Sequence, residues 1–281
     1  MDAGDNAIEL IYACRNSVDV ISDSEIEHSL LWLKWQSLNQ FHPDRRLNLL
    51  GIHPGGRRVF EYHHVRPFLP KFAQDWWDLH EGWIREGIMG SGTDELMYQQ
   101  WWNRFERWVG RWPVGSSIDE QQRFVSQLFS RPRWRLFQRL NSSPWMSTWM
   151  EQIQKQLLQG LYWEPIHCRT LNSYQHAPRS LRPDVKMTET FCRWTSHHTS
   201  MLKYLRSQPS NSAAGLYLGE GLTCSMELGE ELRRVLSVGA PVLLWQHSKP
   251  SDVQGFNWKL LSPHYTGFLA GRPWVAFKES A

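Results

Sequence analysis

The sequence predicts an α/β protein: a mixed sheet with packed helices and a tryptophan-rich helical insertion. In the last third, segments typical of strands alternate with segments typical of helices, which favours a parallel or mixed sheet. Eleven of the 17 tryptophans lie between Trp76 and Trp163. We expect three consecutive parts: a strand–helix–hairpin segment at 1–66, a tryptophan-rich helical segment at 67–160 and a C-terminal βαβαβ segment at 161–281.

The N-terminal segment carries strand signals on both sides of one helix. Residues 7–13 are rich in β-branched and aromatic side chains, which predicts a strand. The run from Ser22 to Glu25 is typical of a helix start, and the helix should continue to about Asn39 before Pro43. Residues 47–53 and 57–62 then predict a β-hairpin, because Pro54-Gly55-Gly56 suits a tight turn.

The middle segment begins after Pro67 and Pro70, which oppose both helix and sheet. The sequence predicts helices at 70–86, 93–112, 118–131 and 145–159. In the second of these helices four aromatic residues recur at spacings of four, three and four: Trp101, Phe105, Trp108 and Trp112. Such a stripe is more often core than binding site.

The last segment predicts three strands and two helices. The strands are expected at 163–169, 214–218 and 241–245, and the helices at 188–206 and 227–238. Gly239 is placed where glycine commonly ends a helix. The run 241–245 is continuously apolar, which is typical of a strand buried on both faces.

Charge is distributed unevenly along the chain, although the formal net charge is only +3. Residues 1–100 carry 9 basic and 15 acidic side chains, residues 101–206 carry 16 and 7, and residues 207–281 carry 6 and 6. The acidic first third and the basic middle either face each other or face different partners.

Motifs that would indicate an enzyme are missing from the sequence. It contains no phosphate-binding loop, no H-E-x-x-H, no G-x-S-x-G and no C-x-x-C pair. We therefore expect no cofactor, no metal ion and no catalytic activity, with the four cysteines as reduced, buried thiols. One remaining possibility is cysteine-peptidase chemistry by Cys168 or Cys192 with His167, His197 or His198.

Tryptophan and arginine interleave in the middle of the chain, most densely at 131–139. The tryptophans could simply fill a helical core. The same residue types dominate protein-interface hot spots, and they can also neutralise phosphates and stack on bases. Binding of a protein partner is the preferred interpretation, because the small net charge is weak for a dedicated nucleic-acid binder. Nucleic-acid binding through 101–140 is the alternative. The candidate partner-binding residues are Trp76, Trp77, Trp83, Trp101, Arg104, Arg107, Arg111, Arg131, Arg133, Trp134 and Arg135.

Three stretches in the last part of the chain carry a family resemblance: Gly160–Arg169, Phe191–Trp194 and Glu231–Trp245. In order, they are a strand that ends in arginine, a helix with Arg and Trp, and a helix followed by a Gly–x–Pro–apolar–Trp strand. This order resembles the C-terminal domain of vWA-MoxR-associated proteins over about residues 160–270. The chain departs from that pattern at Gln246-His247, where the family usually has a basic residue, and at His167-Cys168.

The resemblance implies a component of a bacterial antiviral or conflict system, a type of system in which such domains work beside peptidases without catalytic residues of their own. The chain as a whole is similar to a small accessory protein of type III-E CRISPR systems. The resemblance implies that its partners are a peptidase substrate and a sigma-factor-like regulator. We therefore expect a non-enzymatic adaptor. The absence of an 18-residue apolar run and the acidic first 20 residues predict a cytoplasmic protein with no membrane contact.

Overall fold

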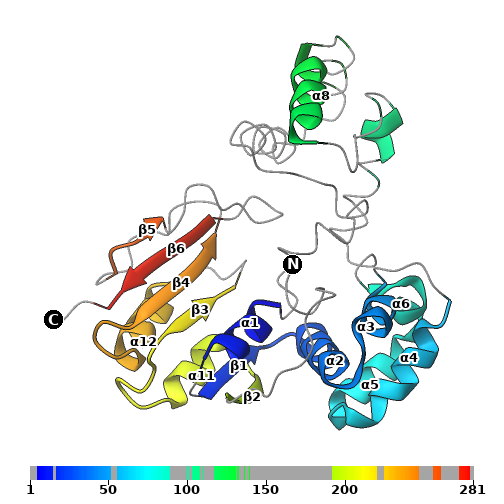
Figure 1. Ribbon diagram of the computed structural model, residues 1–281. Coiled ribbons are helices and arrows are strands. Elements are labelled where there is room, and N and C mark those ends of the chain that lie inside the picture. Colours follow the sequence, from blue (N-terminus) through cyan, green and yellow to red (C-terminus); the bar gives the residue numbers. More distant parts are fainter. Residues whose placement is uncertain are drawn as a thin grey trace. The chain divides into compact units, whose positions relative to one another are not determined.

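The computed structural model confirms an α/β protein with both parallel and antiparallel strand pairs (Figure 1). It describes residues 5–14, 17–51, 56–88, 103–107, 117–130, 192–219, 225–246, 256–260 and 272–278, and the single positions 100, 110, 132, 136 and 139. The chain divides into two compact units, each made of two separate stretches. Unit 1 comprises 1–115 and 164–199, and unit 2 comprises 116–163 and 200–281.

Unit 1 is mainly helical, with one small sheet. Its described elements are α1 (Asp5–Ala13), β1 (Ser17–Ser22), α2 (Glu25–Gln40), α3 (Pro43–Leu50), α4 (Arg58–Val65), the 3-10 helix η1 (Arg66–Phe68), α5 (Lys71–Leu79), α6 (Glu81–Glu86) and β2 (Arg193–His198). Strands β1 and β2 pair in parallel, from Ser17 opposite Arg193 to Ser22 opposite His198. A strand from far along the chain therefore completes the sheet of unit 1.

Helix α2 is the central element of unit 1 and matches the helix predicted from the sequence. Ser24 caps it, because the Ser24 side chain accepts a hydrogen bond from the Glu27 backbone N–H. One side of α2, with Trp35, packs with α1, β1 and β2. Another side, with Leu33, packs with α3 to α6. A helix buried on two sides cannot show a simple amphipathic pattern.

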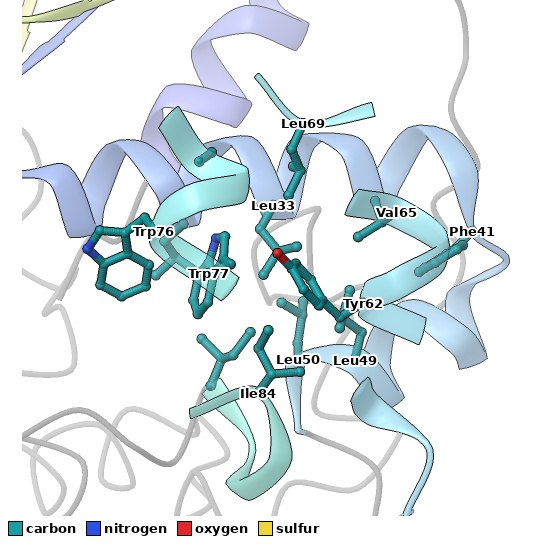
Figure 2. Packing of buried hydrophobic residues seen from close by; sticks show 13 residues of the cluster. Leu33, Phe41, Leu49, Leu50, Tyr62, Val65, Leu69, Trp76, Trp77 and Ile84 are labelled. Atoms are coloured by element: carbon teal, nitrogen blue, oxygen red, sulfur yellow. The ribbon is translucent and has the colours of Figure 1, made fainter. Parts of the chain in front are cut away.

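The larger core of unit 1 lies between α2 and helices α3 to α6 (Figure 2). Trp77 of α5 lies in this core and is only 1% exposed. Its indole Nε1 donates a hydrogen bond to the backbone oxygen of Ser29 over 2.9 Å. Tyr62 and Val65 of α4 pack in the same core. The core thus continues across the boundary expected at residue 66, and it contains helices from both sides of that position.

Two predicted features of the first 66 residues are wrong. Residues 7–13 lie in α1, where Ile8 and Ile11 are spaced to share one helical face and are buried. The predicted hairpin is instead two helices, α3 and α4. Gly51, with a φ of 86°, ends α3 rather than forming part of a hairpin turn, and its N–H bonds to the carbonyls of Leu47 and Asn48.

Two further helix predictions need correction. The helix expected at 70–86 is broken at His80, so that α5 and α6 follow one another as separate helices. Within the helix expected at 188–206, residues 193–198 form strand β2, and only 201–206 are helical, as part of α11 (Met201–Ser207); residues 188–191 lie outside the described part of the chain. The Phe191–Trp194 stretch used in the family comparison is accordingly not helical from Arg193 onwards.

Unit 2 is built on a four-stranded mixed sheet with the order β3-β4-β6-β5. Its described elements are α8 (Ile118–Ser130), α11, β3 (Leu216–Leu218), α12 (Met226–Val235), β4 (Pro241–Gln246), β5 (Lys259–Leu260) and β6 (Arg272–Phe277). β3 and β4 are parallel, whereas β6 is antiparallel to both β4 and β5. The helix expected at 118–131, the helix expected at 227–238 and the strands expected at 214–218 and 241–245 are confirmed within one to three residues at each end.

Basic side chains close the ends of the elements in unit 2. Arg234 of α12 donates hydrogen bonds to the backbone oxygens of Leu205 and Gln208, at the C-terminal end of α11, over 2.6 and 2.7 Å. Lys278 similarly donates to the backbone oxygen of Leu236, at the end of α12. Cations at these positions bind carbonyls at helix C-terminal ends and offset their partial negative charge.

Other predictions fall outside the described residues. These are the helix expected at 145–159, the strand expected at 163–169, most of the helix expected at 93–112 and the boundary at residue 160. Within 103–107 the chain is helical, and Phe105 is fully buried. Among the helices that the structure describes, none combines the length and the apolar character needed to cross a membrane.

Candidate protein-binding surface

Large apolar side chains that remain exposed are concentrated on one part of unit 1. Five of them lie within 24 residues on α4, η1, α5 and α6: Phe60 (54% exposed), Phe68 (50%), Phe72 (44%), Leu79 (82%) and Trp83 (37%). An isolated exposed apolar residue is ordinary, but a group on neighbouring elements is typical of a binding site.

Helix α5 places two of these side chains on one edge. Phe72, Trp76 and Leu79 follow the i, i+4, i+7 spacing of one helical face. Ala73, Trp76 and Trp77 form the buried side of α5, so Phe72 and Leu79 lie where the core meets solvent. Trp76 contributes to both the buried side and the exposed edge of α5, because it packs in the core and its ring also contacts residues at that edge.

Three rings at the turn between α5 and α6 contact one another. The Trp76 ring stacks on His80 with centroids 4.0 Å apart, and Trp83 meets Trp76 edge-on at 5.6 Å. The His80 and Trp83 rings are 5.7 Å apart. His80 is held in place because its Nδ1 lies 2.7 Å from the backbone oxygen of Trp76. We call Phe72, Leu79, His80 and Trp83, supported by Trp76, the α5–α6 aromatic surface.

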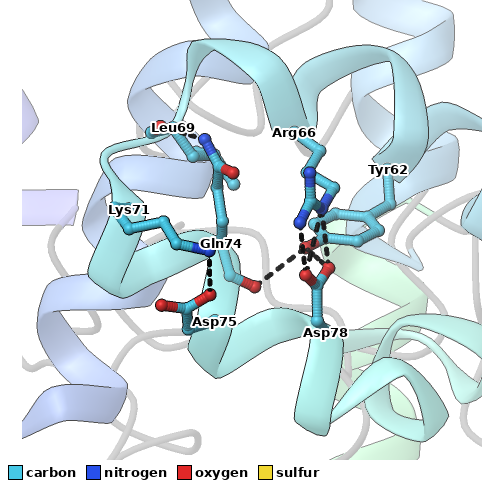
Figure 3. Close-up of polar contacts among 7 residues, drawn as sticks. All are labelled: Tyr62, Arg66, Leu69, Lys71, Gln74, Asp75 and Asp78. Carbon is cyan, nitrogen blue, oxygen red and sulfur yellow. Dashed lines mark hydrogen bonds and ion pairs between the residues drawn. The ribbon is translucent and has the colours of Figure 1, made fainter.

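A polar network fixes α5 against α4 and η1 (Figure 3). The Tyr62 hydroxyl donates to Asp78 Oδ1 over 2.7 Å, and Arg66 donates to both oxygens of the same carboxylate. Arg66 first, and then the Tyr62 hydroxyl, lower the pKa of Asp78 to about 2, against the opposing effect of burial. Burial and the Asp78 carboxylate raise the pKa of Tyr62. The backbone beneath the α5–α6 aromatic surface is thereby held in one position.

Charged side chains near this surface are paired locally. Lys71 pairs with Asp75 over 2.6 Å, and Arg85 pairs with Glu81 over 2.8 Å, both as i,i+4 pairs on their own helices. Pairs of this kind contribute little to stability. Because each pair joins opposite charges, the two pairs add no net charge near Leu79 and Trp83.

The structure separates the candidate residues that were chosen from the sequence. Trp83 is exposed, and so are Arg104 and Arg107 on the helical stretch 103–107. Trp76 and Trp77 are 8% and 1% exposed, so both pack in the core of unit 1, as the core-packing alternative expects, and present little surface to a partner. The remaining candidates lie outside the described residues: Trp101, Arg111, Arg131, Arg133, Trp134 and Arg135.

The sequence interpretation missed Phe72, Leu79 and His80. One signal was present: Trp76 and Trp77 are adjacent and can both be buried only if the core side of α5 is centred between them. Phe72 and Leu79 then fall on its edge.

The cysteine-peptidase alternative gains no support from β2. Cys192 precedes β2 and His197 lies near its end, so their backbones are about 16 Å apart at the rise of an extended strand. Burial raises the pKa of the Cys192 thiol, with Cys14 as a second cause. This opposes formation of the thiolate that a nucleophile requires. Cys168 and His167 lie outside the described residues.

Comparisons with known proteins give no further assignment: no protein-family model matches the chain, and no curated protein is significantly similar to it. In the described part of the chain, no group of three or more His, Cys, Asp or Glu side chains is arranged to hold a metal ion.

Proposed function

We propose that this protein is a non-enzymatic adaptor that holds a protein partner on the α5–α6 aromatic surface. The observation that carries the proposal is the exposure of Leu79 and Trp83 beside a three-ring cluster, on helices that are fixed from below by the Trp77 core and by the Asp78 network. Rigid aromatic anchors lose little conformational entropy on binding, which is why they dominate interface hot spots.

The resemblance to the C-terminal domain of vWA-MoxR-associated proteins supports the biological setting of the proposal. Under it, the partner is a protein of a bacterial antiviral or conflict system, either the substrate of an associated peptidase or a sigma-factor-like regulator. The adaptor positions that partner and performs no bond chemistry itself.

Co-expression with the proteins encoded beside it, followed by size-exclusion chromatography, tests the proposal. The variant Leu79→Ser combined with Trp83→Ser should abolish a complex that the wild type forms, because anchor residues commonly contribute 2 kcal/mol or more, roughly a thirtyfold change in affinity. Met226→Ser is the matched control, because Met226 is 83% exposed on unit 2 and should not affect the complex. A complex that survives the double substitution would place the partner elsewhere.

A second proposal, nucleic-acid binding, is supported by the exposure of Arg104 and Arg107. Under it, a gel-shift assay at about 50 mM salt gives a complex that weakens steeply as salt rises, because each neutralised phosphate releases counterions. Arg104→Gln with Arg107→Gln should reduce that salt dependence, whereas the Leu79/Trp83 variant should not.

A further inference from the structure

His28 of α2 lies where α2, β2 and α5 meet, and one nitrogen of its imidazole makes no hydrogen bond with the described residues. The residue is in the first turns of α2 and only 2% exposed. Its ring centroid is 5.6 Å from that of His198 on β2 and 6.3 Å from that of Phe72 on α5. Within the described residues, His28 Nε2 has no hydrogen-bond partner.

The groups that face His28 supply little compensation for a positive charge. From α2, Glu27 is the nearby carboxylate, and it already accepts a hydrogen bond from the Ser22 hydroxyl over 2.7 Å. From β2, the facing titratable group is His198, whose own Nε2 lies 3.0 Å from the backbone oxygen of Asp23. Backbone carbonyls of Ser22 and His197 also face the ring, and α5 contributes the apolar Phe72.

Protonation of His28 is therefore unfavourable in the folded protein. Burial lowers the pKa of His28 below 6.5, and His198 lowers it further, against smaller opposing effects of the carbonyls and Glu27. A folded state that binds fewer protons than the unfolded chain loses stability as the pH falls. Here the loss begins near the unfolded value of about 6.5 and continues down to the folded pKa.

The second histidine of β2 next to His198 contacts a different strand. His197 Nε2 is 2.8 Å from Asp19 Oδ1 on β1, and both side chains are partly exposed. The ring of His198 is therefore the imidazole of β2 that contacts His28.

We propose that His28 and His198 form an acid-sensitive latch that holds β2 on α2, and that acidification releases β2 from α2 without unfolding the helices α3 to α6. The other contacts of β2 with α2 involve Trp194 and Ser196. Trp32 Nε1 donates a hydrogen bond to Ser196 Oγ over 3.1 Å, and the Trp194 ring lies 4.6 Å from Trp32 and 5.3 Å from Trp35. The chain continues from β2 through Thr199 into α11, so release would free the segment that leads into unit 2.

Hydrogen exchange of the full chain, followed by mass spectrometry at pH 7.5 and pH 5.0 and corrected for the intrinsic exchange rate, tests the latch. In the wild type, peptides covering 193–198 should lose protection at pH 5.0, because β2 then lacks its packing on α2. Peptides covering α4 and α5 should keep their protection. His28→Leu, which keeps an apolar side chain at the site, should remove most of the response of β2.

His63→Leu is the matched control, because His63 is an exposed histidine on α4 and its loss should leave the response of β2 unchanged. If His28→Leu does not fold, His198→Gln gives the same information, since it removes the second imidazole and should reduce the loss of protection. The proposal is overturned if β2 keeps its protection at pH 5.0, if His28→Leu or His198→Gln responds like the wild type, or if α4 and α5 lose protection together with β2.

Discussion

The two units of this protein are stabilised in different ways. Unit 1 relies on buried aromatic rings, with Trp77 and Tyr62 at the centre of its larger core. Unit 2 has a mainly aliphatic core between its sheet and α12, and its helix ends are closed by Arg234 and Lys278. We therefore expect the loss of one large aromatic side chain to be the most costly change in unit 1, and the loss of a basic side chain that binds helix-end carbonyls to have a smaller, local effect in unit 2.

The largest effect should come from the centre of unit 1. Trp77→Ala should destabilise the protein by about 4 kcal/mol, because it leaves a large cavity and also removes the hydrogen bond to Ser29. Trp83→Ala should cost less than about 1 kcal/mol, since Trp83 is already partly exposed. Urea unfolding followed by circular dichroism measures both. Equal losses in the two variants would contradict the distinction between core and surface.

A smaller effect is expected from unit 2. Arg234→Ala should cost about 1 to 3 kcal/mol, because hydrogen bonds from its guanidinium to the carbonyls of Leu205 and Gln208 are lost together with the contact to Glu231. Arg233 is the matched control, since it is exposed on the same helix and Arg233→Ala should be nearly neutral. Hydrogen exchange of α11 is the more specific measurement, and unchanged protection there would argue against the closing role of Arg234.

The smallest effect should be the acid response of the Asp78 network. The pKa of Asp78 is lowered to about 2, below the ordinary value of 3.8, so its stabilisation is complete above about pH 4 and is lost as the pH falls through 2. Because both side chains of the Arg66–Asp78 pair are about one third exposed, solvent screening should keep the effect small.

Unfolding of unit 1 between pH 4.5 and pH 2 can be compared in the wild type and in Asp78→Asn, which should have a flatter pH dependence. Asp75→Asn serves as the control, because Asp75 lies on the same helix in an exposed pair with Lys71. If both variants flatten the curve equally, the network around Tyr62 has no special role.

Predictions from the sequence succeeded where the signal was local and the tertiary structure agreed with it. Ser24 caps α2 through the Glu27 N–H three residues later, a contact that needs nothing from elsewhere in the chain. The apolar run that became β4 is a central strand, and Val242 and Leu244 on one of its faces are 0% and 1% exposed. Leu243 on the other face is only half-buried, so the expected burial on both faces holds for one face.

Predictions failed where packing overrode local preference. The β-branched and aromatic residues of α1 suggested a strand, but burial of Ile8 and Ile11 against α2 selects a helix. For β2 the opposite happened, because the partner that makes it a strand lies more than 170 residues earlier in the sequence. No local pattern carries information about a pairing of that range.

The candidate surface was predicted only in part. Composition located the tryptophans of α5 and α6 but could not show which of them are exposed, since Trp76, Trp77 and Trp83 are the same residue type within eight positions. Their different burial depends on the break at His80, which the sequence interpretation placed inside a continuous helix.

The distant origin of β2 has a consequence for synthesis on the ribosome. The core around Trp77 uses residues up to Ile88, so it can assemble as soon as those residues have emerged. The second packing layer of α2 waits for Cys192 and Trp194, and at about 10 residues per second this is a delay of roughly ten seconds. During that interval α1 can already pack on this side of α2, but Trp35 lacks the cover that Trp194 supplies in the complete chain.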